Sequence, residues 1–113
     1  MLKGNIMKKM SLEKGYWAIV GNGPYGLWIG QVRATDAEVA QTHSVRLYNA
    51  RNIRYWYGRK GGISSLAAFG PCGARVKDSR IGAPIKFTLL LDVKAIHCCS
   101  DEAVAAFAVI VCA

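Results

Sequence analysis

A stretch that alternates basic and aromatic residues, Arg46 to Lys60, carries the side chains best suited to binding an anionic partner. Arginine pairs with phosphate through two parallel hydrogen bonds, and aromatic rings stack on nucleic-acid bases. On a strand, Trp56 would face away from Tyr55 and Tyr57, so we predict that Trp56 belongs to the core and that the tyrosines are exposed. The residues predicted to contact a partner are Arg46, Arg51, Arg54, Tyr55, Tyr57, Arg59 and Lys60.

The charge distribution supports the same interpretation. The chain has fifteen Lys and Arg against seven Asp and Glu, which gives a formal net charge of +8. No carboxylate occurs between Val39 and Lys77, although this stretch holds many of the basic residues. A region of one sign attracts nucleic acid, a nucleotide or an acidic protein surface. The alternative is a solvated face that serves only solubility.

The residues that usually perform catalysis or bind metals are sparse. His43 and His97 are the only histidines, and neither has a nucleophile and an orienting group at a suitable spacing. Neighbouring side chains on a strand point to opposite faces, so His97, Cys98 and Cys99 do not converge easily on a zinc ion. We therefore expect reduced thiols, no metal, no cofactor and no enzymatic activity.

A glycine-rich segment, Gly21 to Gly26, matches the G-x-G-x-x-G pattern of dinucleotide-binding proteins. That pattern requires a helix to begin at the glycines, and here Leu27 to Ala34 continues as a strand. Pro24 also favours a turn. We predict a hairpin turn at this segment and no dinucleotide site.

The surrounding pattern predicts short strands, since aromatic and β-branched residues alternate with polar ones. Asn49 to Asn52 interrupts the third strand, which indicates either a bulge or the tight turn of a hairpin. The fourth strand is a nearly continuous apolar run, and we expect it to be buried. The predicted strands are Tyr16 to Val20, Leu27 to Ala34, Val45 to Tyr57, Ile85 to Leu91 and Val93 to Cys98.

Two segments have helical patterns. Ile63 to Phe69 has apolar residues at three-residue spacing and ends at Gly70, which predicts a short helix. Ser100 precedes two carboxylates and predicts the start of a final helix, Asp101 to about Val109, that packs onto the sheet. We expect Thr35 to Ser44 to be a polar loop or a strand extension and Cys72 to Pro84 to be an irregular basic loop.

Together these elements predict a mainly β protein of the α+β class. The expected architecture is a small antiparallel sheet, barrel or half-barrel of five or six strands, with one short helix and a C-terminal helix. We expect residues 1–12 to be a flexible N-terminal tail and residues 13–113 to form a single β-rich domain. No apolar run approaches the roughly 18 residues that span a bilayer, and no signal-peptide core is found, so we expect a cytoplasmic protein.

Several of these segments resemble an uncharacterised family of short proteins in tailed bacteriophages and prophages. The resemblance extends in patches over about residues 15–110. The chain departs from the family in its enlarged loops, and it has Arg54 where the family prefers an aromatic or aliphatic residue. The resemblance implies a phage origin but no activity. It is carried by Gly15 to Val20, Gly26 to Gly30, Asn49 to Trp56, Ser64 to Ala67 and Cys99 to Ala103.

Three functions follow as expectations. The first is a non-enzymatic phage accessory protein that binds nucleic acid or a nucleotide through the basic-aromatic patch, in the host bacterial cytoplasm. The second is an inhibitor that uses the same patch against the acidic surface of a host protein, such as a bacterial defence complex. The third is a homo-oligomeric virion or assembly component, because sheet edges near Tyr25 to Val32 could pair between chains.

Overall fold

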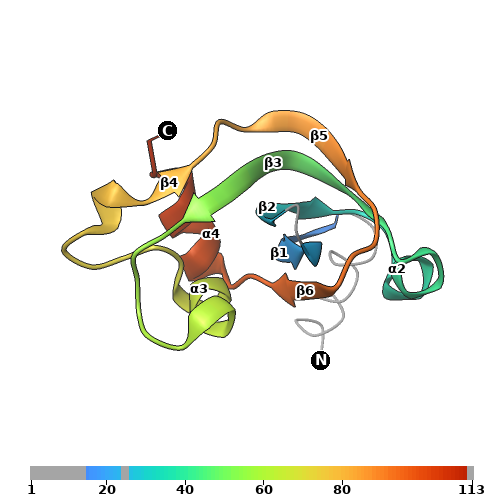
Figure 1. The fold of residues 1–113 in the computed structure, drawn as a ribbon, viewed down its shortest axis with the longest axis horizontal. Coiled ribbons are helices and arrows are strands. Elements are labelled where there is room, and N and C mark those ends of the chain that lie inside the picture. The colour runs from blue at the N-terminus through green and yellow to red at the C-terminus, as the bar shows by residue number, and fades with distance from the viewer. Residues whose placement is uncertain (1–14, 24–25, 112–113) are drawn as a thin grey trace, which may run out of the picture.

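The computed structural model describes residues 15–23 and 26–111 of the chain, so the predicted tail of residues 1–12 lies outside the described residues. Within these ranges six strands form one sheet, and three α-helices accompany it (Figure 1), in agreement with the predicted α+β class. The strands are β1 (Tyr16–Gly21), β2 (Leu27–Val32), β3 (Val45–Tyr55), β4 (Arg80–Ile81), β5 (Ile85–Leu90) and β6 (Ala95–Cys98). The helices are α2 (Asp36–Thr42), α3 (Gly62–Phe69) and α4 (Asp101–Ala108), with a 3-10 turn, η3 (Val76–Asp78).

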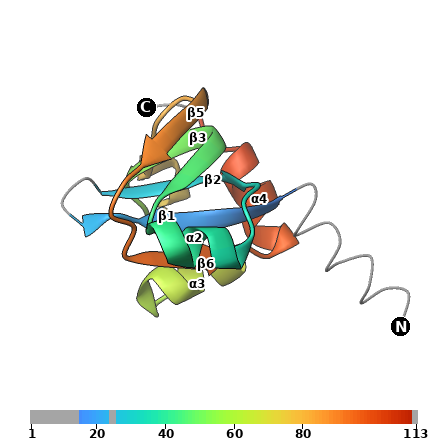
Figure 2. The same cartoon turned by 90° about the vertical axis from the view of Figure 1, so that its right-hand side faces the viewer.

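The sheet is open and antiparallel, in the order β4-β3-β2-β1-β6. One edge of β3 pairs with β2, and its other edge pairs first with β5 and then with β4. Figure 2 shows β5 at one edge of the sheet and β6 at the other. A closed barrel is therefore a wrong expectation. The expected sheet edge near Tyr25 to Val32 is also wrong, because β2 lies between β1 and β3.

Strand alternation divides the core between the two faces of the sheet. On one face, here called the helix face, Ile19 and Ile29 pack with Phe107 of α4. On the opposite face, Val20 and Leu47 pack in a second buried cluster. Trp17, Trp28 and Trp56 are partly buried and pack against these clusters, Trp17 and Trp56 on the helix face and Trp28 on the opposite face.

The interruption in β3 is a bulge within one continuous strand. Tyr48 pairs with Gln31 and Arg51 pairs with Ile29, so three steps along β3 match two steps along β2. Asn49 sits between them with a φ of 53°. Asparagine tolerates this left-handed conformation better than most residues. The predicted bulge is confirmed, and the hairpin alternative is wrong.

The segment expected to be a polar loop forms helix α2 instead. The Thr35 hydroxyl accepts a hydrogen bond from the Glu38 backbone N–H (3.2 Å), and the Thr35 N–H donates to the Glu38 carboxylate (3.0 Å). This reciprocal capping box satisfies backbone donors that a helix start otherwise leaves unpaired. The sequence signal for this helix was the spacing Thr-x-x-Glu at its start. The capping box forms although the polar composition of the segment had suggested a loop.

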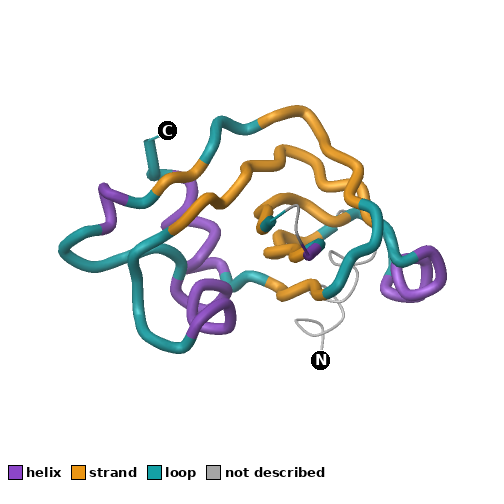
Figure 3. The backbone as a smooth tube through the Cα atoms, in the orientation of Figure 1, coloured by secondary structure: helices purple, strands orange, loops and turns teal. Residues whose placement is uncertain are grey.

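The other two helices confirm their predictions. α3 ends at Gly70, whose φ is 73°, and Ser100 caps α4 by accepting a hydrogen bond from the Ala103 N–H (3.0 Å). Figure 3 shows α3, α4 and η3 gathered near the end of β3, with α2 on the other side of the fold. No helix in residues 15–23 and 26–111 combines the length and the apolar character that crossing a bilayer requires.

The fourth predicted strand exists as β5, but the expectation that it is buried is wrong. Ile85, Phe87 and Leu89 expose 43%, 45% and 51% of their surface. The reason is topological, because β5 is an edge strand and its only partner among the described strands is β3. The expected loop from Cys72 to Pro84 is interrupted by η3 and by β4, which adds to β3 beyond β5.

The glycine-rich segment joins two antiparallel strands. Gly21 of β1 pairs with Leu27 of β2, and the Asn22 N–H donates to the Gly26 carbonyl oxygen (3.2 Å). The hairpin turn is thus confirmed, and no helix begins at the glycines as a dinucleotide site would require.

Candidate functional site

Two of the predicted tyrosines meet two arginines from a later part of the chain. The rings of Tyr55 and Tyr57 are 6.1 Å apart between centroids and nearly perpendicular, at 82°. The Arg75 guanidinium carbon lies 4.4 Å from the centre of the Tyr57 ring, and that of Arg80 lies 6.0 Å from the centre of the Tyr55 ring. We call these four residues the tyrosine–arginine cluster. It is a surface of aromatic rings and cations held at cation–π distances.

The pairing of β3 with β4 brings the cluster together. Arg80 pairs directly with Tyr55 across the two strands, so their side chains are neighbours. Tyr57 lies beyond the end of β3, and its backbone N–H donates to the buried Ser79 hydroxyl (2.9 Å). The Tyr57 carbonyl oxygen accepts from the Cys72 N–H (2.9 Å). The ring of Tyr57 is therefore held by a fixed backbone.

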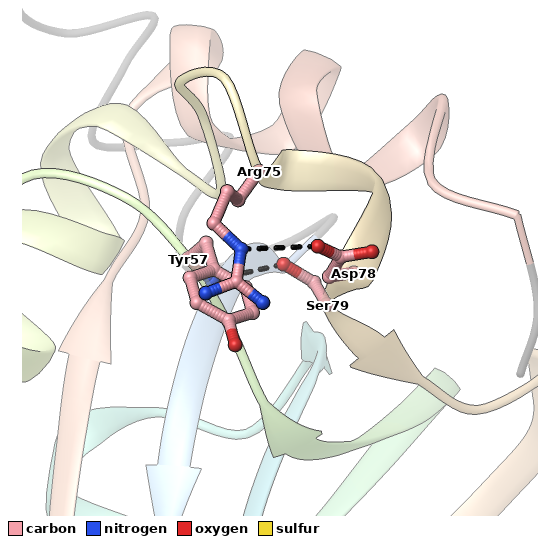
Figure 4. A network of polar contacts seen from close by, with 4 residues as sticks. All are labelled: Tyr57, Arg75, Asp78 and Ser79. Atoms are coloured by element: carbon pink, nitrogen blue, oxygen red, sulfur yellow. Dashed lines mark hydrogen bonds and ion pairs between the residues drawn. The ribbon is translucent and has the colours of Figure 1, made fainter.

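The turn η3 positions Arg75. Its Nε atom donates to a carboxylate oxygen of Asp78 at 3.1 Å, while the guanidinium lies over Tyr57 (Figure 4). The hydrogen bond to Asp78 is the main reason that the pKa of Arg75 is raised above its ordinary value. In sequence, Asp78 is the only carboxylate between Val39 and Leu91. The ion pair orients Arg75 and leaves the surrounding surface predominantly basic.

Arg51 does not belong to an exposed patch, and the expectation that its side chain is exposed is wrong. Its side chain is 9% exposed. Its guanidinium donates to the carbonyl oxygens of Gly82 (2.7 Å), Phe107 (2.7 Å) and Ile110 (3.0 Å). The last carbonyl groups of a helix lack partners within the helix, and a cation there also interacts favourably with the helix dipole. Arg51 thus binds the end of α4.

The remaining predicted residues are exposed but lie in different places. Arg46 lies over Phe87 of β5, at 4.7 Å from the ring centre. Arg59 lies over Phe69 of α3, at 4.2 Å. Arg54 and Lys60 are exposed. Among the seven predicted residues, only Tyr55 and Tyr57 belong to the tyrosine–arginine cluster.

Arg75 and Arg80 are the cluster residues that the sequence did not single out. Both lie in the segment expected to be an irregular loop, and their basic charge was the only signal. β4 is only two residues long, too short for a recognisable strand pattern. The pairing of Arg80 with Tyr55 links residues 25 positions apart, which no local pattern records.

The cysteine and histidine region has no arrangement suited to a metal ion. Across residues 15–23 and 26–111, no three His, Cys, Asp or Glu side chains come together as a metal site would require. Burial, with a smaller contribution from Cys98, raises the pKa of the Cys99 thiol to about 12. A thiol with a raised pKa is a poor nucleophile and a poor metal ligand at neutral pH.

The fold is thus an α+β domain with an open antiparallel sheet, a basic-aromatic surface beside β4 and an exposed edge strand. The chain belongs to the family described as a domain of unknown function (DUF6948), whose model matches residues 18–107. No curated protein matches the chain. No solved structure matches it either.

Proposed function

We propose that this protein is a non-enzymatic binding protein that contacts single-stranded nucleic acid or a nucleotide through the tyrosine–arginine cluster. The observation that carries the proposal is the arrangement of Tyr55 and Tyr57, whose rings lie 6.1 Å apart with a guanidinium near each. Rings offer stacking surfaces to bases, and guanidinium groups pair with phosphates. The resemblance to phage proteins supports a role as a phage accessory protein in the bacterial cytoplasm.

Exposed bases fit this surface better than a duplex does. Tyr55 exposes 45% of its surface, enough for a base to stack on the ring. Each stacked base contributes about 1 to 3 kcal/mol, and stacking tolerates any base because every base has a π-face. In a duplex the bases are already stacked on each other. The cluster is therefore expected to prefer single strands or free nucleotides.

Phosphate binding would come from Arg75, Arg80 and the neighbouring Lys77, all of which are exposed. Asp78 offsets part of the charge of Arg75, so electrostatic attraction comes from the surface as a whole more than from this pair. Phenol rings and guanidinium groups bind phosphates and bases but do not act as general bases near neutral pH. This chemistry supports binding without catalysis.

Fluorescence anisotropy with labelled twelve-nucleotide dT and rU strands tests the proposal. We expect binding at about 50 mM salt. A plot of the logarithm of the association constant against the logarithm of the salt concentration should have a slope of about −2, for three phosphate contacts. Tyr55→Ser should weaken binding at least about fivefold, the loss expected for one stacked base. Arg80→Ser should weaken binding and make the salt slope shallower.

The matched control is Arg33→Ser, which removes an equal charge from an arginine that lies over the Tyr48 ring, outside the cluster. This variant should bind the strands much like the wild type does. If no strand and no mononucleotide binds at low salt, or if Arg33→Ser is as damaging as Arg80→Ser, the cluster is not a nucleic-acid site.

A further inference from the structure

The exposed side of β5 is an apolar feature that the tyrosine–arginine cluster does not use. Ile85, Phe87 and Leu89 are two residues apart, so they point to the same side of the strand. All three are about half exposed, and Leu91, which follows the strand, is more exposed still. An edge strand with a row of exposed apolar side chains is a liability for a monomer and commonly marks an interface.

This row continues onto the neighbouring strands. Tyr48 of β3 pairs with Phe87, and their ring centroids are 6.3 Å apart. Arg33 lies 3.9 Å from the centre of the Tyr48 ring, and Arg46 lies 4.7 Å from that of Phe87. We call this region the β5 surface; its residues are Arg33, Arg46, Tyr48, Ile85, Phe87 and Leu89.

The β5 surface is the part of the helix face that the helices leave uncovered. Gln31 follows Ile29 by two positions on β2, and it pairs with Tyr48. Ile29 is covered by Phe107 of α4 in the core cluster of that face. The same face is thus buried where β3 ends and exposed where β3 begins.

The backbone of β5 can also take part in binding. Its one partner among the described strands is β3, so its other edge presents N–H and C=O groups to an added strand. An extended peptide that adds to a sheet edge gains affinity from these main-chain groups and specificity from alternate side chains.

Charge selects the partner. Arg33, Arg46 and Lys86 are exposed on or beside the apolar row. In sequence, β5 and β3 contain no carboxylate. If two copies of this chain met through this surface, the same cations of each copy would face each other. Each copy has a net charge of +8, so the two would repel each other. An acidic partner meets complementary charge instead.

We propose that the β5 surface binds an acidic, extended segment of a partner protein, which adds to the sheet as a strand beside β5. Apolar side chains of that segment pack on Phe87 and Leu89. Its carboxylates reach Arg46, which lies over Phe87, on one side of the strand and Lys86 on the other, while Arg33 adds positive charge farther along the same face. This site is separate from the tyrosine–arginine cluster, so the proposal does not depend on the proposed nucleic-acid site.

Selection from a displayed library of random twelve-residue peptides tests this proposal on the full chain. We expect the recovered peptides to alternate apolar residues with Asp or Glu and to lack proline in the central positions. A synthetic peptide of that consensus should protect β5 amides from hydrogen exchange. Recovery of basic peptides, or of no peptide, would overturn the proposal.

Two variants localise the binding. Leu89→Ser should weaken binding of the consensus peptide at least tenfold. Val109→Ser, which shortens an apolar side chain beyond α4 that is even more exposed (79% against 51%), should not weaken it. Equal effects of the two variants would count against the β5 surface.

Two further outcomes would replace the proposal. If size-exclusion chromatography gives a concentration-dependent dimer that Leu89→Ser disrupts, the partner is a second copy. If the labelled dT strand loses affinity in Phe87→Ser and keeps it in Tyr55→Ser, the β5 surface binds nucleic acid.

Discussion

The Arg51 guanidinium of β3 donates a hydrogen bond of 2.7 Å to the carbonyl oxygen of Phe107, in the last turn of α4. The two residues are 56 positions apart in the chain. A further hydrogen bond, to the Ile110 carbonyl oxygen, holds the chain two residues beyond the end of the helix. Phe107 also belongs to the buried cluster of the helix face. Arg51 therefore fixes the end of α4 next to the helix residue that packs into this core. An arginine in a basic-aromatic stretch thus has a structural role.

Replacing Arg51 by methionine should lower the free energy of unfolding by about 2 to 4 kcal/mol. Methionine keeps much of the apolar stem but removes the donor of the Gly82 and Ile110 carbonyl oxygens, whereas the Phe107 carbonyl still accepts from the Ile110 N–H (3.1 Å). A buried group left unpaired costs about 1 to 3 kcal/mol. Urea unfolding followed by circular dichroism measures the change. Arg54→Met is the matched control, because Arg54 is exposed and its replacement should change stability by less than about 0.5 kcal/mol. Equal losses in the two variants would contradict the role of Arg51.

Gly70→Ala should be much more destabilising than Gly73→Ala. Both glycines have a positive φ, 73° and 94°, so an alanine is strained at either position. A Cβ atom at Gly70 would come within 2.6 Å of the Ala106 Cβ atom of α4, whereas a Cβ atom at Gly73 would meet nothing within 4 Å. The larger loss expected for Gly70→Ala comes from this close approach of the end of α3 to α4. It should appear as a lower midpoint in thermal unfolding for Gly70→Ala, and indistinguishable midpoints would argue against that packing.

The phenol of Tyr16 should ionise late in an alkaline titration. Burial and the nearby Asp36 carboxylate raise its pKa from 10.0 to about 12, and its hydroxyl donates to Asp36 at 3.4 Å. The unfolded chain loses this proton first, so Tyr16 should favour unfolding progressively as the pH rises from about 10 to about 12. Absorbance at 295 nm should show a late component that Tyr16→Phe removes and that Asp36→Asn shifts to lower pH. A late component that survives in Tyr16→Phe would show that another residue causes it.

Local patterns were sufficient for most of the fold. The alternation of residues predicted every strand of the sheet except β4, and Gly70 and Ser100 marked a helix end and a helix start that the structure confirms. Helix α2 was missed because its polar composition concealed the capping box of Thr35 and Glu38. The burial of β5 was predicted wrongly because an apolar strand at an edge and one at the centre of a sheet have similar sequences. The position of a strand in the sheet depends on pairings between distant residues.

The candidate site was less predictable, for the same physical reason. Alternation along one strand correctly placed Trp56 against the core and left Tyr55 exposed, but Tyr57, which was also predicted to be exposed, is partly buried. It could not identify Arg51 as buried, because its partners are carbonyl groups at Gly82 and beyond Ala106. Nor could it bring Arg80 beside Tyr55, since that contact depends on a strand of two residues.

The pairing of β6 with β1 has a consequence for synthesis on the ribosome. Ala18 pairs with Cys98, and Gly21 pairs with Ala95, so the outer edge of β1 has no neighbour until the last part of the chain emerges. Translation proceeds at about 5 to 20 residues per second, so this edge stays uncovered for a time on the order of seconds after β3 has been made. Nascent chains, and fragments released before Ala95, expose an apolar strand edge to other chains and to chaperones. Premature termination upstream of β6 should therefore yield an aggregation-prone product.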